Sequence, residues 1–265
     1  MTAMNPKNFQ HCRYEVDGPV VTITINRPEV LNALHPQGHQ EMSDAFDCFA
    51  ADDSLRVAIV TGSGDRAFCV GTDLKFLAET GLANKPKTGF AGMTHRFDLW
   101  KPVIGAVNGL CLGGGVEMLG GCDLAVASEH ARFGLPETRV GLAASGGGTL
   151  QRLPRQIAMK HAMALVLTGQ PISAQEAARI GLINEVVPAD QVLARARELA
   201  EEILACAPLA VMASKQVMLQ SLAQADLSAV MHENYPILQQ MLASQDAIEG
   251  PKAFAEKRKP NWTGS

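Results

Sequence analysis

The sequence predicts an α/β fold followed by a helical C-terminal region. Three short apolar runs are typical of strands buried on both faces: residues 57–60, 103–107 and 124–127. Each run leads into a glycine-bearing loop or a helical pattern, and strands that alternate with helices favour a largely parallel sheet. We therefore expect an α/β core over residues 1–189 and a helical region over residues 190–265.

Two further elements precede the first apolar run. Residues 14–25 predict a hairpin, with its turn at Asp17-Gly18 and with apolar residues alternating with threonines on the second strand. A helical pattern then covers residues 36–50. The stretch 79–92 contains glycines, lysines and a proline without a sustained period, and we expect it to be a mobile loop.

A capping motif in the C-terminal half marks the start of a predicted helix. Ser173 and Glu176 have the spacing of a capping box, which predicts a short helix that ends before Gly181. Residues 183–187 have the pattern of a last strand. We expect three helical elements beyond them, at about residues 190–206, 208–222 and 225–248.

Length and composition are typical of an ordinary globular protein. The 265 residues are enough to bury a core, and 47% hydrophobic with 19% charged residues argues against extensive disorder. A net charge of -4 gives no reason to expect nucleic acid or an anionic membrane as partner. The N-terminal segment lacks secretion and transit signals, and no apolar run approaches a membrane span. We expect a soluble, cytoplasmic protein.

The cysteines and histidines do not favour a metal site. The six cysteines form no CxxC pair, and most have apolar neighbours, as Cys69 and Cys111 do, which is typical of reduced, buried thiols. His35 and His39 are four residues apart with Glu41 nearby, but no HExxH pattern exists. We expect no metal.

Three glycine-rich segments are candidate ligand sites. Residues 62–67 match GxGxxA, but residues 68–73 are unsuited to the long helix that a dinucleotide-binding loop requires. Residues 141–149 lack a GxSxG elbow, because residue 143 is alanine. In the third segment, residues 107–117, a buried strand leads through glycines into a helix, whose free N–H groups suit a developing oxyanion.

Two glutamates accompany this third segment. Glu117 lies about one turn into the predicted helix, between Val116 and Met118, and Glu137 follows 20 residues later in the sequence Phe-Gly-Leu-Pro-Glu. A lone glutamate is usually a solvated surface group, but one that follows three glycines among apolar residues is a candidate acid or base.

A series of ordered motifs runs through the chain. They are Ile25-Asn-Arg-Pro-Glu29, Leu31-Asn-Ala-Leu34, Ala67-Phe-Cys-Val-Gly-Thr-Asp-Leu74, Lys101-Pro-Val-Ile-Gly-Ala-Val-Asn-Gly109, Leu112-Gly-Gly-Gly-Val-Glu117, Cys122-Asp123, Phe133-Gly-Leu-Pro-Glu137, Leu167-Thr-Gly169, Ile172-Ser-Ala174 and the closing segment 249–260. In this order they resemble the crotonase, or enoyl-CoA hydratase/isomerase, superfamily over nearly the full length.

The resemblance implies a fold, an assembly and a substrate. The fold would be a spiral of repeated ββα units, followed by helices that build a trimer or a dimer of trimers. The substrate would be an acyl-CoA thioester, with no separate cofactor, because coenzyme A is part of the substrate. The backbone amides of Thr72 and Gly114 would form the oxyanion hole, although alanine is common in the family where Thr72 stands.

Substrate-binding residues follow from the same resemblance. The positions that match segments around the CoA thioester are Arg27, Leu31, Ala33, Gly71, Asp73, Leu74, Lys75, Gly113, Pro136 and Ser145. Two interpretations of the basic tail, Lys257 to Lys259, stay open: contact with the CoA phosphates of a neighbouring subunit, or a solvated surface.

The two glutamates discriminate among reactions of the family. Hydratases of this kind use two acids to position water and to protonate the α-carbon, whereas double-bond isomerases need only the acid that matches Glu137. Glu117 and Glu137 together therefore favour enoyl-CoA hydration. Ser145, with Ala144 before it, departs from the proline and glycine of many hydratases and leaves the acyl group open. Isomerisation, carnitinyl-type dehydration and a non-catalytic scaffold or RNA-binding role are the alternatives.

Overall fold

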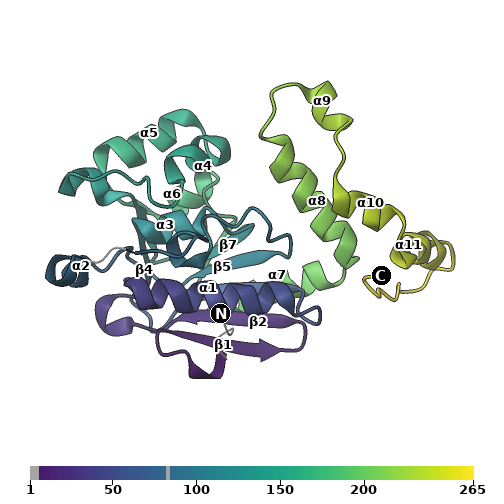
Figure 1. The fold of residues 1–265 in the computed structure, drawn as a ribbon, viewed down its shortest axis with the longest axis horizontal. Helices are drawn as coiled ribbons and strands as arrows, with labels where there is room; N and C mark the ends of the chain where they lie inside the picture. The colour runs from purple at the N-terminus through teal and green to yellow at the C-terminus, as the bar shows by residue number, and fades with distance from the viewer. Residues whose placement is uncertain (1–5, 82–83) are drawn as a thin grey trace. The chain divides into compact units, whose positions relative to one another are not determined.

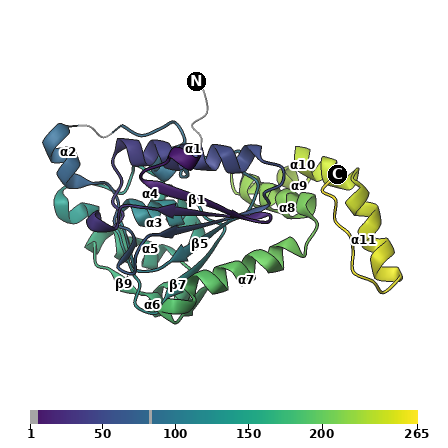
Figure 2. The ribbon, with the colours of Figure 1, turned by 90° about the horizontal axis from the view of Figure 1, so that it is seen from below.

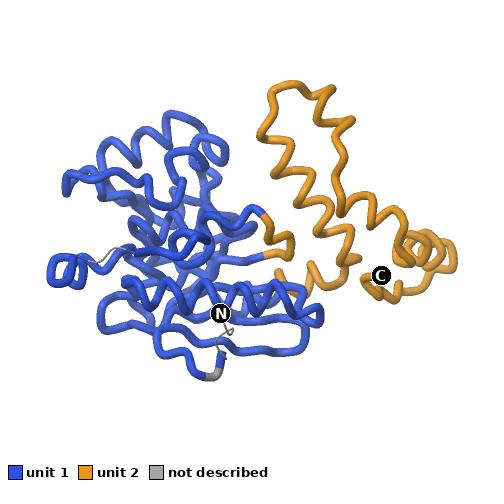
Figure 3. The backbone as a smooth tube through the Cα atoms, viewed as in Figure 1, with its two compact units in different colours: residues 1–97, 103–198 blue, residues 98–102, 199–265 orange. Residues whose placement is uncertain are grey.

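The computed structural model describes residues 6–81 and 84–265, and the chain divides into two compact units (Figure 1; Figure 3). Unit 1 contains residues 1–97 and 103–198, and unit 2 contains residues 98–102 and 199–265. The division falls within helix α7 (Val192–Leu204). The domain boundary expected near residue 189 stays a prediction.

The larger sheet of unit 1 has six strands. In spatial order they are β1 (Cys12–Asp17), β2 (Val20–Ile25), β3 (Val57–Gly62), β5 (Val103–Val107), β7 (Leu124–Ser128) and β10 (Glu185–Val187). β1 and β2 form the predicted antiparallel hairpin, and the other neighbours pair parallel. β2, β3 and β5 are buried at every position, which explains their apolar sequences.

A second sheet gives unit 1 its spiral form. Its strands are β4 (Ala67–Cys69), β6 (Leu110–Leu112), β8 (Arg132–Gly134) and β9 (Ile172–Ser173). The first three follow directly after β3, β5 and β7, and each leads into a helical segment: α2 (Leu74–Thr80), α3 (Gly114–Leu119) and the 3₁₀ turn η4 (Pro136–Val140). The predicted α/β spiral of ββα units is confirmed, although the short strands of this sheet were not predicted individually.

Helices cover the larger sheet on both sides. Figure 2 shows α1 (Pro36–Ala51) and α6 (Ala174–Arg179) on opposite sides of the strands, and α4 (Thr149–Gln156) and α5 (Met159–Thr168) follow each other along the chain. The fully buried residues of α1 include Met42, Phe46 and Phe49. Their spacing of three and four residues places them on one helix face, which packs against the hairpin.

Unit 2 is helical, as the sequence predicts, but its third element is broken. α8 (Pro208–Ser221) is followed by three short helices, α9 (Leu227–Met231), α10 (Pro236–Leu242) and α11 (Gln245–Ala255). The prediction of one long element over residues 225–248 is therefore wrong. Pro236 forces Tyr235 into an extended conformation, which ends any helix before it, and Ser244 caps a new helix at the Ala247 N–H.

Several local predictions can be compared with the structure. Ser173 accepts the Glu176 N–H at 3.1 Å, as the capping box predicts, although the Glu176 carboxylate pairs with Arg179. The predicted strand 183–187 is shorter, since β10 begins at Glu185. In the predicted loop 79–92, the first two residues end α2 and the last three form the 3₁₀ turn η3 (Phe90–Gly92), so its limits were wrong.

The mobility of that loop stays a prediction, and its residues 82–83 lie outside the described part of the chain. Among the described helices, none is by itself long and apolar enough to cross a bilayer. Only the segments 189–204 and 208–221, taken together across a sharp bend, meet that criterion.

A buried carboxylate fixes the start of the hairpin to α1. Glu41, which is 7% exposed, accepts three backbone N–H groups on one oxygen, from Gln10 (2.9 Å), His11 (2.6 Å) and Cys12 (3.2 Å). A buried charge tolerates desolvation only with such hydrogen bonds. The His11 ring in turn packs edge-on against the His35 ring at 4.4 Å, so this anchor also positions residues near the site described below.

Replacement of Glu41 should destabilise the fold. In Glu41→Ala three buried or half-buried amides lose their acceptor, and we expect the free energy of unfolding to fall by about 2–4 kcal/mol. Urea unfolding followed by circular dichroism measures this change. Glu15→Ala on the exposed face of β1 is the matched control, and an equal loss in both variants would contradict the anchoring role of Glu41.

Candidate active site

Two backbone amides lie side by side where the second sheet leads into α2 and α3. β4 and β6 pair in parallel, so the chain segments that leave them are neighbours. Gly71, at φ +97°, comes so close to α3 that a methyl group on it would lie 3.0 Å from the Gly114 nitrogen. Thr72 follows Gly71 and bridges Leu34. Within the described residues, neither the Thr72 nor the Gly114 amide donates to a protein acceptor.

Free amides at a helix start suit an anionic oxygen, because the N–H groups and the helix dipole both favour negative charge. The segment that presents Thr72 is held rigidly on both sides: the Leu34 N–H donates to the Gly71 carbonyl at 2.8 Å, and the Asp73 N–H donates to the Leu34 carbonyl at 2.9 Å. The structure thus brings the two predicted oxyanion-hole residues together.

Glu117 lies on the first turn of α3 and is 4% exposed. Its Oε1 accepts the Gly147 N–H at 2.8 Å, and a methyl group on Gly147 would lie 2.7 Å from the Glu117 Cβ. A backbone N–H that donates to a carboxylate stabilises its charged form. Residue 147 therefore has to be glycine for this contact to exist.

Arg152 holds the turn that makes this contact. From α4 its guanidinium donates to the Gly147 carbonyl at 2.8 Å and to the Thr94 carbonyl at 2.5 Å. Burial lowers the pKa of Arg152, and the negative charge of Glu117 opposes that shift. One side chain thus connects the Glu117 partner to the loop that carries Phe90.

Glu137 is in a different environment. It is half-buried at the start of η4, where a methyl group on Gly113 would lie 3.0 Å from its Oε1. Its Oε2 is buried and has no hydrogen-bond partner among the described residues. Burial raises the pKa of Glu137 above 4.5, and the nearby charge of Glu117 raises it further. The two carboxyl groups therefore interact, and their hydrogen-bonding environments differ.

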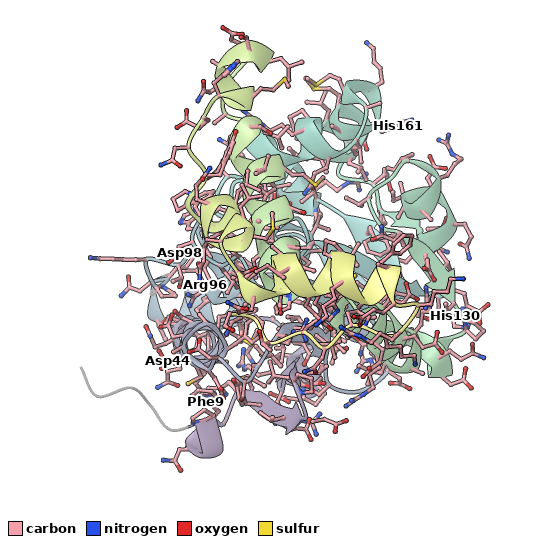
Figure 4. The ribbon with its side chains drawn as sticks, turned by 90° about the vertical axis from the view of Figure 1, so that its right-hand side faces the viewer. Phe9, Asp44, Arg96, Asp98, His130 and His161 are labelled. Atoms are coloured by element: carbon pink, nitrogen blue, oxygen red, sulfur yellow. The ribbon has the colours of Figure 1, made fainter. Side chains whose placement is uncertain are left out.

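Phe90 forms the wall behind the Gly114 amide. A methyl group on Gly114 would collide with the Phe90 ring. The loop of Phe90 is tied to α1 by Arg96 (Figure 4), which donates to the Gly92 carbonyl at 2.6 Å, the Ser43 carbonyl at 2.8 Å and Asp47 Oδ1 at 2.7 Å. Packing against Phe90 therefore requires glycine at position 114.

The segment 27–33 contains the predicted substrate-binding residues Arg27, Leu31 and Ala33. An ion pair ties it to the segment of Thr72. Arg27 Nη1 donates to Asp73 Oδ2 at 2.9 Å and to the Ala33 carbonyl at 2.5 Å. Burial acts to raise the pKa of Asp73, but the Phe76 N–H and Arg27 together hold it below its usual value. Asp73 also caps α2 at Phe76 (3.1 Å).

A pocket opens beside these residues. It is lined by Leu34, His35, Pro36, His39, Thr72, Asp73, Leu74, Phe76, Leu77, Asn84, Lys85 and Leu142. Of the predicted substrate-binding residues, this lining contains Asp73 and Leu74. Gly71 lies next to the Gly114 nitrogen, and Gly113 lies next to the Glu137 carboxyl group. Burial lowers the pKa of His39 to about 3, with the charge of Lys85 adding to the effect, so this imidazole is neutral.

Each of the three residues considered above as possible metal ligands, His35, His39 and Glu41, has another partner. His35 Nδ1 accepts the Gly38 N–H at 3.2 Å, His39 Nδ1 accepts the Ala91 N–H at 3.0 Å, and Glu41 binds the hairpin. Among residues 6–81 and 84–265, no group of three or more His, Cys, Asp or Glu could hold a metal ion.

The other predicted residues lie around this centre. Pro136 begins η4 directly before Glu137, Leu31 adopts a left-handed conformation (φ 55°), and Lys75 is exposed on α2. Ser145 is exposed, and its hydroxyl lies 3.5 Å from the Ala143 carbonyl; no hydrogen bond joins it to either glutamate within the described structure.

One residue of the basic tail, Arg258, is paired with acidic residues of the same chain. Arg258 forms a bidentate ion pair with Glu249, at 2.5 and 2.8 Å, and also contacts Glu256. This favours the interpretation of Arg258 as a surface residue. For Lys257 and Lys259 both interpretations, contact with CoA phosphates and a solvated surface, stay open.

Comparison with known proteins identifies the family. A family model described as Enoyl-CoA hydratase/isomerase matches residues 15–265. Among curated relatives, carnitinyl-CoA dehydratase of Proteus mirabilis (strain HI4320) is 43% identical over 257 residues, covering 93% of this chain and 96% of that protein. Carnitinyl-CoA dehydratase of Salmonella arizonae is 42% identical over 258 residues, covering 94% and 96%.

Solved structures agree in fold. Enoyl-CoA hydratase from Mycobacterium tuberculosis H37Rv is 40% identical with a TM-score of 0.90, covering 96% of this chain and 99% of that one. Enoyl-CoA hydratase from Bacillus anthracis is 35% identical with a TM-score of 0.87, covering 97% and 100%. The chain therefore belongs to the enoyl-CoA hydratase/isomerase family, which its motifs predicted, and is a hydratase-like enzyme of the hydro-lyase type.

Proposed function

We propose that this enzyme adds water across the 2,3 double bond of an enoyl-CoA thioester. The observation that carries the proposal is the convergence of two carboxyl groups in different environments, Glu117 and Glu137, beside the free amides of Thr72 and Gly114. Hydration needs a base for water, an acid for the α-carbon and donors for the enolate oxygen, and these four groups can supply all three.

The environments of the two glutamates assign their roles. Glu117, stabilised as a carboxylate by the Gly147 N–H, takes a proton from water as its oxygen attacks C3. Glu137, whose pKa is raised by burial, is the better placed of the two to act as an acid, and it donates a proton to C2. The substrate thioester oxygen carries the enolate charge between these steps, at the amides of Thr72 and Gly114.

The proton balance closes within the pair of glutamates. Water gives its hydroxyl oxygen to C3 and one proton to Glu117, while C2 receives the proton of Glu137. The product is a 3-hydroxyacyl thioester, and one proton then has to return from Glu117 to Glu137, directly or through water. No redox partner or cofactor is required, in keeping with a substrate that carries its own coenzyme A.

Dehydration of a carnitinyl thioester is the second candidate. The relatives at 41–43% identity are carnitinyl-CoA dehydratases, which favours it, and loss of water from a 3-hydroxyacyl thioester is the reverse of the reaction above. The same two acids would serve. A double-bond isomerase needs only one acid, and a scaffold needs none, so the paired environment of Glu117 and Glu137 supports neither.

Each glutamate should be essential for turnover and dispensable for binding. In Glu117→Gln or Glu137→Gln the amide keeps the shape but can neither take nor give the required proton. We expect kcat for crotonyl-CoA to fall by about a hundredfold to ten-thousandfold. Loss of the conjugated enoyl absorbance measures turnover, and titration with a saturated acyl-CoA measures binding. Near-wild-type turnover in either variant would refute the role of that residue.

The oxyanion hole should depend on main-chain groups alone. Thr72→Ala keeps the amide and should retain most activity, whereas Gly114→Pro both deletes the donor and brings its ring against Phe90, and should reduce kcat by about a hundredfold to a thousandfold or more. Circular dichroism and oligomer size check that both variants fold. If Thr72→Ala were inactive although well folded, its hydroxyl would be required and the backbone assignment would fail.

We propose a symmetric oligomer, a trimer or a dimer of trimers. Unit 2 exposes large apolar side chains, among them Met218, Leu227, Met231 and Phe254, the last 87% exposed. Water-exposed residues of this size favour burial against another copy. Sedimentation at micromolar concentration should give three or six times the mass of the chain, and a stable monomer would disprove the assembly.

A further inference from the structure

An ammonium group lies near one of the two proposed catalytic carboxylates, Glu117. A methyl group on Gly146 would lie 2.6 Å from Lys85 Nζ and 3.7 Å from Glu117 Oε2, so both atoms border the same point. Lys85 Nζ also lies 5.4 Å from the centre of the Phe90 ring, which packs against Gly114. Lys85 therefore reaches the region where the carbons nearest the double bond of an enoyl thioester would lie.

Lys85 also belongs to the pocket. It lines the same recess as Thr72, Leu77 and Leu142, and its charge contributes to the low pKa of His39 after burial. Lys85 itself is solvent-exposed, so its ammonium lies where the pocket meets water. The same lining contains the Asp73 carboxylate, which is paired with Arg27.

The other charges of the site are largely balanced. The carboxylate of Glu117 interacts with the guanidinium of Arg152, and Asp73 of the pocket lining pairs with Arg27. Within the described residues Lys85 forms no ion pair, and its Nζ is the atom nearest to the Gly146 position. Its charge is therefore open to a substrate group at this point.

We propose that Lys85 selects the acyl group by its charge. On the basis of the proposed hydration, it favours enoyl-CoA thioesters that carry an anionic group, such as a carboxylate, on C4, and it disfavours those with a cationic group there. A trimethylammonium group, as in a carnitinyl thioester, would bring two positive charges together at short range in a partly buried site. This chain then differs in substrate from its carnitinyl-CoA relatives.

Three thioesters that differ only at C4 test this inference. They share the four-carbon 2-enoyl group of crotonyl-CoA and carry hydrogen, a carboxylate or a trimethylammonium group on C4. For the wild type we expect kcat/KM to be at least about tenfold higher for the carboxylate than for the trimethylammonium substrate, and this ratio to fall with salt. A preference for the trimethylammonium substrate would overturn the inference.

Variants of Lys85 assign the selectivity to this residue. Lys85→Gln should bring the ratio close to one, and Lys85→Glu should reverse it; each ratio is taken within one variant, so a change in turnover common to both substrates cancels. Lys87→Gln, an exposed lysine of the same loop outside the pocket lining, is the matched control and should leave the ratio unchanged. An unaltered ratio in both Lys85 variants would refute the proposal.

The inference and the proposed function fail in different ways. If wild-type enzyme hydrates none of the three substrates, hydration is wrong. Dissociation constants of the matching saturated thioesters then still test Lys85, because binding should retain the preference for the carboxylate in wild type and lose it in Lys85→Gln. Equal affinities of the wild type for the charged thioesters would refute charge selection by itself.

Discussion

The close approach of two glycine-bearing segments is the constraint on which the site depends. β4 and β6 pair in parallel, so the segments after them leave the sheet side by side. Only because Gly71 has no side chain can it lie against the Gly114 nitrogen, and only because Gly114 has none can the Phe90 ring close behind it. Any side chain at these positions would separate the Thr72 and Gly114 amides, and no arrangement of glutamates would restore a place for the enolate oxygen.

The same spiral places two identical side chains in different surroundings. Glu117 is on a helix turn that faces the Gly147 N–H, whereas Glu137 follows Pro136 in a short turn where one oxygen has no partner. The difference between the two acids thus comes from their backbone surroundings. Arg152 fixes the surroundings of Glu117, since the carbonyl it holds belongs to the residue whose N–H donates to Glu117. The turn and the loop of Phe90 are fixed to each other through Thr94.

Local signals in the sequence predicted the parts of the structure that depend on local physics. The hairpin, α1, the buried strands and the helix that carries Glu117 follow from periodicity, turn residues and glycine spacing. The helix breaks around Pro236 were missed although proline gave the signal. Gly147, Arg152 and Lys85 were missed for another reason: their roles are contacts with residues 30 or more positions away, or with groups that only the folded spiral brings near. The candidate acids could be predicted, but not the partners that distinguish them.

The likeness to carnitinyl-CoA dehydratases and to enoyl-CoA hydratases supports the fold and the reacting groups more strongly than it supports any one acyl group. Strand pairing, the glycine contacts and the two glutamates are common requirements of water addition and water loss, so they do not distinguish the acyl group. The acyl group is distinguished by side chains such as Lys85, on a loop whose backbone the spiral does not dictate. A single ammonium there changes the electrostatic preference of the pocket without altering the fold or the reacting atoms. Relatives of this chain can therefore share its chemistry and differ in substrate, and we propose the charge of Lys85 as a feature of this chain that sets its acyl preference.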